Sequence, residues 1–198
     1  MHGLINRSIE RFVHDTYGDN TWQDTMRRLD TGIAEFEPML TYEDELTVRL
    51  MKALAHVLDR PEADILEDIG TYLVSHPSFE SLRRLLRFGG VTFVDFLHSL
   101  DDLPERARLA VSDLHLPGME LREITSEYFC LTVHSEQIGM PGFGYAVMGL
   151  LRAMADDYGA LVMLEVQENQ GWHETIQIKL LEAAFASGRD FDLGARVG

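Results

Sequence analysis

Two histidine–glutamate pairs are the residues whose types and spacing could bind a metal ion. His134 and Glu136 stand two positions apart in a segment that alternates like a strand, and His173 precedes Glu174 near a turn. Imidazole and carboxylate groups are common zinc ligands, but a zinc site draws at least three ligands from the protein. Neither pair has a third ligand at a recognisable spacing, so the sequence predicts no metal site.

Other patterns that could carry chemistry are incomplete. The stretch GMPGFGYAV begins like a dinucleotide-binding loop, but Val147 stands at the third glycine position and the stretch follows a predicted hairpin. Arg83, Arg84 and Arg87 form a dense basic patch, yet on a helix they span more than one face, which is typical of a solvated surface. The sequence also lacks a nucleophile elbow. It therefore predicts a protein that is not an enzyme.

The composition is that of an acidic globular protein. The chain has 198 residues and a net charge of −16, which predicts repulsion from nucleic acid and from anionic lipid surfaces. It has no run of about 18 apolar residues that could span a membrane, and residues 1–13 lack the layout of a signal peptide. Its single cysteine, Cys130, allows no internal disulfide. We therefore expect a cytoplasmic protein without a nucleic-acid or membrane partner.

The elements that must position these residues begin with helices. In the first half of the chain, apolar side chains recur at helical spacing. Helices are predicted at residues 5–18, 21–29, 41–58, 61–74, 78–88 and 92–103. Thr21 and Asp24 resemble a capping box at one helix start, and Gly18 marks a helix end. The last of these helices should end within about two or three residues of Pro104, because the residue before a proline disfavours helical backbone.

After about residue 118 the apolar period changes from helical to alternating. Strands are predicted at residues 119–124, 127–135, 160–166 and 174–181, with a helix at 142–159 and a turn at Asn169 and Gly171. This order predicts an α+β fold, with a helical N-terminal lobe and a C-terminal four-stranded antiparallel sheet that carries one long helix. The expected layout is a single domain at 1–182, divided into lobes at 1–65 and 66–182, and a tail at 183–198.

The order of these segments resembles the heme nitric oxide/oxygen-binding (H-NOX) family. The resemblance is carried by MHGLINRSIERFV, YG followed by TW, YEDELTVRLMKALAHVL, ILEDIGTYLV and SLRRLLRFGGVTFVDFLHSLDDL, and it runs to about residue 182. Each piece is degenerate, but their order and spacing together are specific. The resemblance implies a heme that lies between a helical lobe and a lobe with an antiparallel sheet.

The resemblance also implies a gas sensor with a defined heme site. In the family, one histidine in a Leu-Asp-x-Leu-His stretch at the end of a helix binds the heme iron. A Tyr-x-Ser-x-Arg triplet on the first hairpin holds the heme propionates. Nitric oxide weakens the iron–histidine bond, and the change reaches a partner. The implied partners are signalling proteins such as a histidine kinase or a cyclic-nucleotide enzyme.

This chain departs from both heme motifs. LDDLP aligns with the iron-binding stretch, so Pro104 stands where the histidine is expected, and proline has no side-chain lone pair for iron. VHSEQ aligns with the triplet: Val133 replaces tyrosine, Ser135 is retained and Gln137 replaces arginine. The changes remove the guanidinium fork that best suits a carboxylate. Because the three residues alternate in phase with the apolar side of the predicted strand, we expect them to share its inward face.

Pro104 also has a purely local explanation. Asp102 and Glu105 resemble a capping box that places Pro104 in the first turn of a new short helix. Other histidines are poorly placed to replace the iron ligand. His98 lies six residues before Pro104, which on an ideal helix is about 240° and about 9 Å away, so His98 should point away from the apolar face. His115 would require a different chain path.

Two functions remain open. The first is a non-enzymatic H-NOX-like signalling domain without histidine-ligated heme, which responds to another apolar ligand in the inherited cleft or acts through protein contacts. The second is a heme-based gas sensor with an unusual ligand. We favour the first, because the iron ligand and both strong propionate anchors are lost together. Besides Pro104, Ser135 and Gln137, the residues expected to line a small apolar cavity, or to fill it, are Ile5, Leu73, Leu97, Leu100 and Val133.

Overall fold

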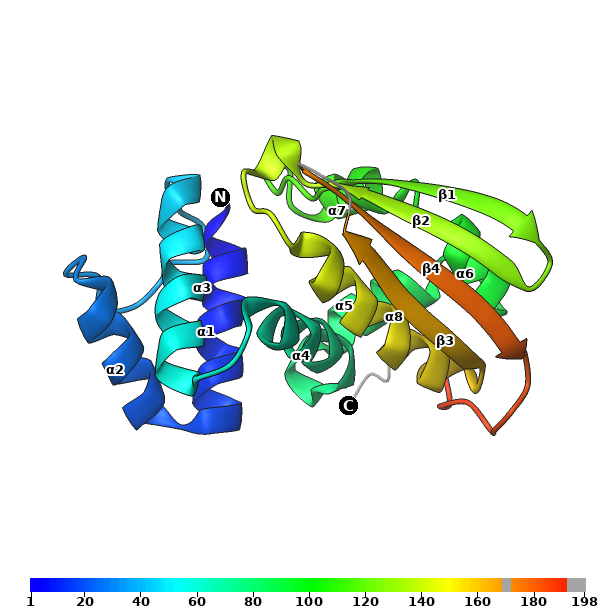
Figure 1. Ribbon diagram of the computed structural model, residues 1–198, viewed down its shortest axis with the longest axis horizontal. Coiled ribbons are helices and arrows are strands. Elements are labelled where there is room, and N and C mark those ends of the chain that lie inside the picture. The colour runs from blue at the N-terminus through cyan, green and yellow to red at the C-terminus, as the bar shows by residue number, and fades with distance from the viewer. Residues whose placement is uncertain (169–171, 192–198) are drawn as a thin grey trace.

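The computed structural model describes residues 1–168 and 172–191. Three helices form the N-terminal lobe: α1 (Gly3–Tyr17), α2 (Asp19–Leu29) and α3 (Asp44–Leu58). Their apolar faces meet in a core that includes the buried side chains of Phe12 and Leu50. Helix α4 (Glu62–Ser75) leads from this lobe to the rest of the molecule (Figure 1). No helix in the described ranges is long and apolar enough to cross a membrane.

Four short helices connect α4 to the sheet. They are η1 (Pro77–Phe79), α5 (Glu80–Arg87), α6 (Phe93–His98) and α7 (Leu103–Ala110). Helices α6 and α7 lie behind the sheet in the view of Figure 1. Their buried apolar side chains, together with those of α8 and of the inward face of the sheet, form the second core of the molecule.

The sheet has the predicted four antiparallel strands. They are β1 (Gly118–Thr125), β2 (Tyr128–His134), β3 (Leu161–Glu168) and β4 (His173–Glu182). Their spatial order is β1-β2-β4-β3, and each neighbouring pair is antiparallel. Between the two hairpins lie η2 (Glu136–Ile138) and the long helix α8 (Phe143–Tyr158). The α+β prediction is therefore confirmed, while the predicted turn at Asn169 and Gly171 lies outside the described residues.

Helix α8 joins the two lobes through its close contact with α4. A Cβ atom at Gly70 would lie 1.9 Å from the Ala146 carbonyl oxygen, and one at Gly149 would lie 1.9 Å from the Glu67 carbonyl oxygen. Only glycine lets the two helix backbones approach this closely. Because Ala146 belongs to the N-terminal core and Val147 to the core under the sheet, α8 contributes to both.

The predicted end of the helix at residues 92–103 is wrong. Helix α6 ends at His98, six residues before Pro104, and a turn separates it from α7. The Ser99 hydroxyl donates to the Phe96 carbonyl oxygen, and Arg106 donates to the Ser99 carbonyl oxygen at 3.0 Å. These bonds satisfy carbonyl groups that a longer helix would use itself, so α6 stops there. Leu103 is then the first residue of α7 despite preceding a proline.

The start of α2 was also misplaced at Thr21. The helix begins at Asp19, and Gly18 serves both as the end of α1 and as the start of α2. The φ angle of Gly18 is 85°, which lets the chain turn between the helices without a linker. Thr21 lies inside α2 and its hydroxyl donates to the Tyr17 carbonyl oxygen. The turn at Gly18 therefore sets the start of α2, and the capping pattern at Thr21 does not.

A capping box at the start of α6 gives a first testable prediction. Thr92 Oγ1 accepts from the Asp95 N–H at 3.1 Å, and the Asp95 carboxylate accepts from the Thr92 N–H at 3.0 Å. We expect Thr92→Ala to lower the free energy of unfolding by about 1 kcal/mol, because it removes the side-chain cap. Urea denaturation at pH 7 measures this. Thr92→Ser keeps the hydroxyl and is the control; equal midpoints for the alanine variant and the wild type would contradict the prediction.

The same capping box predicts how the stability of the fold changes with pH. Hydrogen bonds from the Thr92 backbone and side chain lower the pKa of Asp95 below its usual 3.8. A carboxyl group with a lowered folded-state pKa stabilises the fold above its unfolded pKa and loses that contribution as the pH falls through the folded value. The stability difference between the wild type and Asp95→Ala, measured by urea denaturation, should therefore shrink as the pH falls below about 4.

Candidate functional site

Pro104 is the second residue of α7 and is half-buried. Proline fits this position because N–H groups in the first turn of a helix have no acceptor within the helix, so the N–H group that proline lacks costs no hydrogen bond. The predicted placement in the first turn of a short helix is confirmed. The predicted capping box is absent, since Asp102 precedes α7 without a side-chain cap bond. The adjacent Asp101 instead accepts a hydrogen bond from the Leu121 N–H at 2.8 Å.

Neither alternative histidine faces the core. The side chain of His98 is 49% exposed, and its Nε2 atom lies 3.1 Å from a carboxylate oxygen of Glu123. This confirms that His98 points away from the apolar face of α6. His115 is exposed and contacts the carbonyl oxygen of Asp113 at 3.0 Å. In the described part of the chain, no group of three or more His, Cys, Asp and Glu residues could hold a metal ion.

The end of β2 separates the three residues that align with the propionate-binding triplet, Val133, Ser135 and Gln137. Val133 is fully buried on the inward face of the strand, and Ser135 directly after the strand is also fully buried. Gln137 is exposed, because η2 turns the chain out of the strand at Glu136. The expected common face is therefore correct for Val133 and Ser135 and wrong for Gln137. The alternating pattern predicts an inward side chain at residue 137, whereas β2 ends at His134.

Ser135 is hydrogen-bonded to the carboxylate of Glu174, whose place in the sequence suggests only a possible metal ligand. Its hydroxyl donates to Oε2 of Glu174 at 3.1 Å. Oε1 of Glu174 accepts from the Gly142 N–H at 2.7 Å, and Oε2 also accepts from the Gly144 N–H at 3.3 Å. Glu174 is only 6% exposed. We call Ser135, Gly142 and Gly144 the carboxylate cradle.

The two histidines of the candidate metal pairs contact each other. His134 and His173 are directly paired across β2 and β4, and their Nδ1 atoms lie 2.9 Å apart. One imidazole must donate and the other accept in such a contact. The Nε2 atom of His134 lies 3.8 Å from a carboxylate oxygen of Glu120 on β1. The tertiary structure thus brings His134 and His173 together, a pairing across strands that their sequence positions do not reveal.

The five residues predicted to line the cavity are divided between the two cores. Leu97, Leu100 and Val133 are fully buried in the core under the sheet. Ile5 and Leu73 are partly buried and pack against the N-terminal core. The first three lie among other buried apolar side chains, as expected for positions that are filled by packing.

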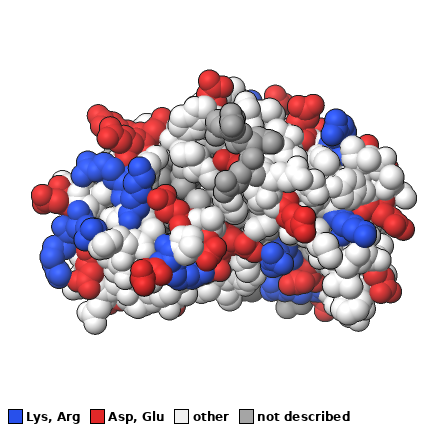
Figure 2. Space-filling view, viewed as in Figure 1, with Lys and Arg blue, Asp and Glu red and all other residues white. Residues whose placement is uncertain are grey.

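Two surface hollows of the N-terminal lobe lie elsewhere. One, of about 420 Å³, is lined by residues that include Ile33, Tyr42 and Leu46. The other, of about 320 Å³, is lined by Arg28, Leu29, Arg49, Lys52, Ala53 and His56. Figure 2 shows basic side chains over the end of the molecule formed by α2 and α3. Neither hollow contains any of the predicted site residues.

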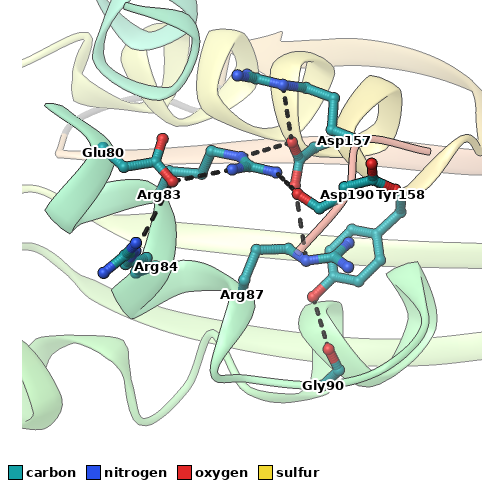
Figure 3. Close-up of polar contacts among 9 residues, drawn as sticks. Glu80, Arg83, Arg84, Arg87, Gly90, Asp157, Tyr158 and Asp190 are labelled. Atoms are coloured by element: carbon teal, nitrogen blue, oxygen red, sulfur yellow. Dashed lines mark hydrogen bonds and ion pairs between the residues drawn. The ribbon is translucent and has the colours of Figure 1, made fainter. Parts of the chain in front are cut away.

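A buried ion-pair cluster holds α5 and α8 together (Figure 3). Asp157 is 1% exposed and accepts from Nε of Arg83 at 2.7 Å, and the side chain of Arg83 is 5% exposed. Nε of Arg87 lies 3.6 Å from the second oxygen of Asp157. The expected solvated arginine surface is therefore wrong for Arg83 and Arg87 and right for Arg84, whose side chain is 47% exposed. No local sequence pattern indicates this ion pair, because Asp157 lies 74 positions from Arg83.

The electrostatics of this cluster follow from burial and from Asp157. Burial alone would lower the pKa of Arg83, but the hydrogen bond and the charge of Asp157 outweigh it and raise that pKa. Burial raises the pKa of Tyr158 to about 12. The Tyr158 hydroxyl donates to the Gly90 carbonyl oxygen, and the Arg87 guanidinium lies 3.9 Å from the centre of the Tyr158 ring. The raised pKa values leave Arg83 positively charged and Tyr158 neutral at neutral pH, which indicates a structural cluster.

The segment after β4 is attached to this cluster. The N–H groups of Phe185 and Ala186 donate to the Gly159 carbonyl oxygen at 2.8 and 3.1 Å. The Arg189 N–H donates to the Asp157 carbonyl oxygen at 2.9 Å. The part of the predicted tail that the structure describes therefore packs against the end of α8.

Solved structures of H-NOX proteins have the same fold. The H-NOX protein from K. algicida superposes with a TM-score of 0.78 at 16% identity, covering 92% of this chain and 97% of that one. An H-NOX protein from S. oneidensis in the Fe(II)NO ligation state gives a TM-score of 0.74 at 15% identity, covering 92% of this chain and 100% of that one. The helical lobe, the antiparallel sheet and the long helix thus define a protein of the H-NOX fold.

Residues 2–166 match the model of the Haem-NO-binding family, and the chain belongs to this family of sensory domains. Soluble guanylate cyclase 89Db of Drosophila melanogaster is 22% identical over 163 residues, which are 82% of this chain and 24% of that protein. Soluble guanylate cyclase gcy-35 of Caenorhabditis elegans is 29% identical over 178 residues, which are 87% of this chain and 25% of that protein. The chain spans about a quarter of the length of these relatives.

The residues of this chain do not fit the heme site that the family resemblance implies. Pro104 offers no iron ligand, and Val133 offers no hydroxyl. Gln137 is exposed rather than directed to the core, and the Ser135 hydroxyl is engaged by Glu174.

Proposed function

We propose that this chain is a non-enzymatic signalling domain of the H-NOX type that works without a histidine-ligated heme. The observation that carries the proposal is Pro104, which stands at the aligned position of the iron ligand and is held in the first turn of α7. His98, the nearest histidine before it, is turned toward solvent and toward Glu123. The iron–histidine bond that would sense nitric oxide has no counterpart at this position.

The packing under the sheet supports signalling through protein contacts rather than through an apolar ligand. Leu97, Leu100 and Val133 are 0% exposed, as are their neighbours Phe129 and Leu131 on β2. Protein interiors are packed as densely as organic crystals, so such side chains leave little room for a ligand. A change of state would then pass between the lobes along α8 and its contact with α4.

The relatives support a class of partner. Both relatives named above are soluble guanylate cyclases, so the partner or attached effector that we propose is a cyclic-nucleotide enzyme, with a histidine kinase as the other candidate. Such partners would place the chain in the cytoplasm. The net charge of −16 supports a protein partner over nucleic acid or an anionic membrane.

The test is titration with hemin followed by a desalting column. We expect no Soret band at one heme per chain after desalting, because the iron ligand is missing and hydrophobic burial alone holds heme loosely. Absorption spectra before and after desalting measure the retained heme, with and without nitric oxide.

A sharp Soret band that survives desalting and shifts with nitric oxide would instead establish the heme-sensor alternative. His98→Ala and His115→Ala would then identify a substitute ligand by loss of the band. His56→Ala, which removes an exposed histidine of the N-terminal lobe, is the matched control and should leave the spectrum unchanged.

A further inference from the structure

Glu174 is a buried side chain whose hydrogen-bond partners are neutral donors. It accepts from the Ser135 hydroxyl and from the Gly142 and Gly144 N–H groups, as described above. In the described part of the chain it forms no ion pair with a lysine, arginine or histidine. Glutamate is rarely buried without a partner, because desolvation of the carboxylate is costly unless hydrogen bonds offset it. The burial of Glu174 therefore depends on this specific set of hydrogen-bond donors.

Two features adapt the cradle to a carboxylate. The N–H groups of Gly142 and Gly144 lie at the start of α8, a helix of 16 residues whose N-terminus carries a partial positive charge. A Cβ atom at Gly144 would lie 2.6 Å from the Cβ of Glu174, so glycine is needed for the strand and helix to approach. The Ser135 hydroxyl, which is 0% exposed, supplies the third donor from the end of β2.

Ser135 links Glu174 to the heme motif. It is the one residue of the Tyr-x-Ser-x-Arg triplet that this chain retains, and the resemblance assigns that triplet to the carboxylates of heme propionates. In this structure the same hydroxyl binds a carboxylate of the protein. Val133, at the tyrosine position, is the direct cross-strand partner of Glu174. Directly paired residues have Cβ atoms about 5 Å apart on one face of a sheet, so a tyrosine at residue 133 would compete with Glu174 for space.

We propose that Glu174 is an internal carboxylate ligand that fills the place where the family resemblance puts a heme propionate. It ties the ends of β2 and β4 to the start of α8 without a cofactor. The proposal rests on the proposed heme-independent function, because a bound propionate would have to displace Glu174 from Ser135. The cradle is then a carboxylate-binding site that the chain occupies itself and that an external carboxylate enters only when Glu174 leaves.

Chemical rescue tests this proposal. Glu174→Ala leaves the three donors without their acceptor, and formate is a carboxylate small enough to take the vacated place. We expect the variant to unfold at a lower urea concentration than the wild type, and sodium formate to raise its midpoint more than sodium chloride at equal ionic strength. The wild type should respond equally to the two salts. Glu182→Ala, at the exposed end of the same strand, is the matched control and should also show no preference for formate.

A second measurement covers the case in which Glu174→Ala does not fold. Glu174→Gln keeps the shape of the side chain but loses the charge that strengthens its hydrogen bonds. We expect the Gly142 and Gly144 amide hydrogens to exchange roughly tenfold faster in this variant than in the wild type. Equal responses of Glu174→Ala to formate and chloride, or unchanged exchange in Glu174→Gln, would overturn the proposal.

Different results would contradict the proposed heme-independent function and the proposed role of Glu174. Stable uptake of one heme per wild-type chain would end the heme-independent function, whatever formate does to the variant. Rescue by formate and faster amide exchange depend only on the contacts of Glu174, so their failure would remove Glu174 as an internal ligand and leave the hemin result standing.

Discussion

Asp157→Ala is expected to lower the free energy of unfolding by about 3–5 kcal/mol, because it removes one partner of a buried ion pair and leaves the other charge buried. The variant leaves Arg83 buried without the carboxylate that accepts from it at 2.7 Å. It also removes the negative charge near Arg87 and Arg189, whose Nε atoms lie 3.6 and 3.7 Å from Asp157. Urea denaturation followed by circular dichroism measures the change.

The neighbouring residue provides the control. Asp156 is exposed, so Asp156→Ala should change stability by less than about 0.5 kcal/mol. A double variant, Arg83→Met with Asp157→Leu, removes both charges and should recover part of the loss, because a buried pair is often replaced by apolar side chains at little cost. Similar midpoints for Asp157→Ala and Asp156→Ala would show that the cluster does not stabilise the fold.

Leu97→Ala is expected to cost about 2–5 kcal/mol, because it deletes a large side chain from a filled core. Leu97 is 0% exposed and packs in the core under the sheet. The result bears on the proposed function, since a residue that lines an open, solvated cleft would cost far less when truncated. Urea denaturation gives the loss of stability.

Leu109→Ala is the matched control for this variant. Leu109 lies on α7 and is 89% exposed, so the same change of side chain should leave the midpoint nearly unchanged. If both leucine variants were as stable as the wild type, the positions predicted to line the heme site would not be filled by packing. An apolar ligand would then become the better explanation.

Local sequence patterns determined the class of fold, and they predict the loss of the iron ligand. The change from helical to alternating period near residue 118 placed the helical lobe and the four antiparallel strands, because periodicity reports which side of an element is buried. Pro104 and Val133 could be interpreted from residue type alone, since neither side chain can donate an electron pair or a hydrogen bond. His98 points away from the core as predicted, although the spacing argument assumes one helix from His98 to Pro104 and α6 ends at His98.

The contacts that define the candidate site were decided by the tertiary structure. Glu174 reaches Ser135 across 39 positions, and Asp157 reaches Arg83 across 74, so no local pattern records either pair. The position of Gln137 depended on where β2 ends, and the sequence pattern does not mark that point. Side-chain periodicity shows which residues are buried, whereas the partner of a buried polar group is set by which elements the fold brings side by side.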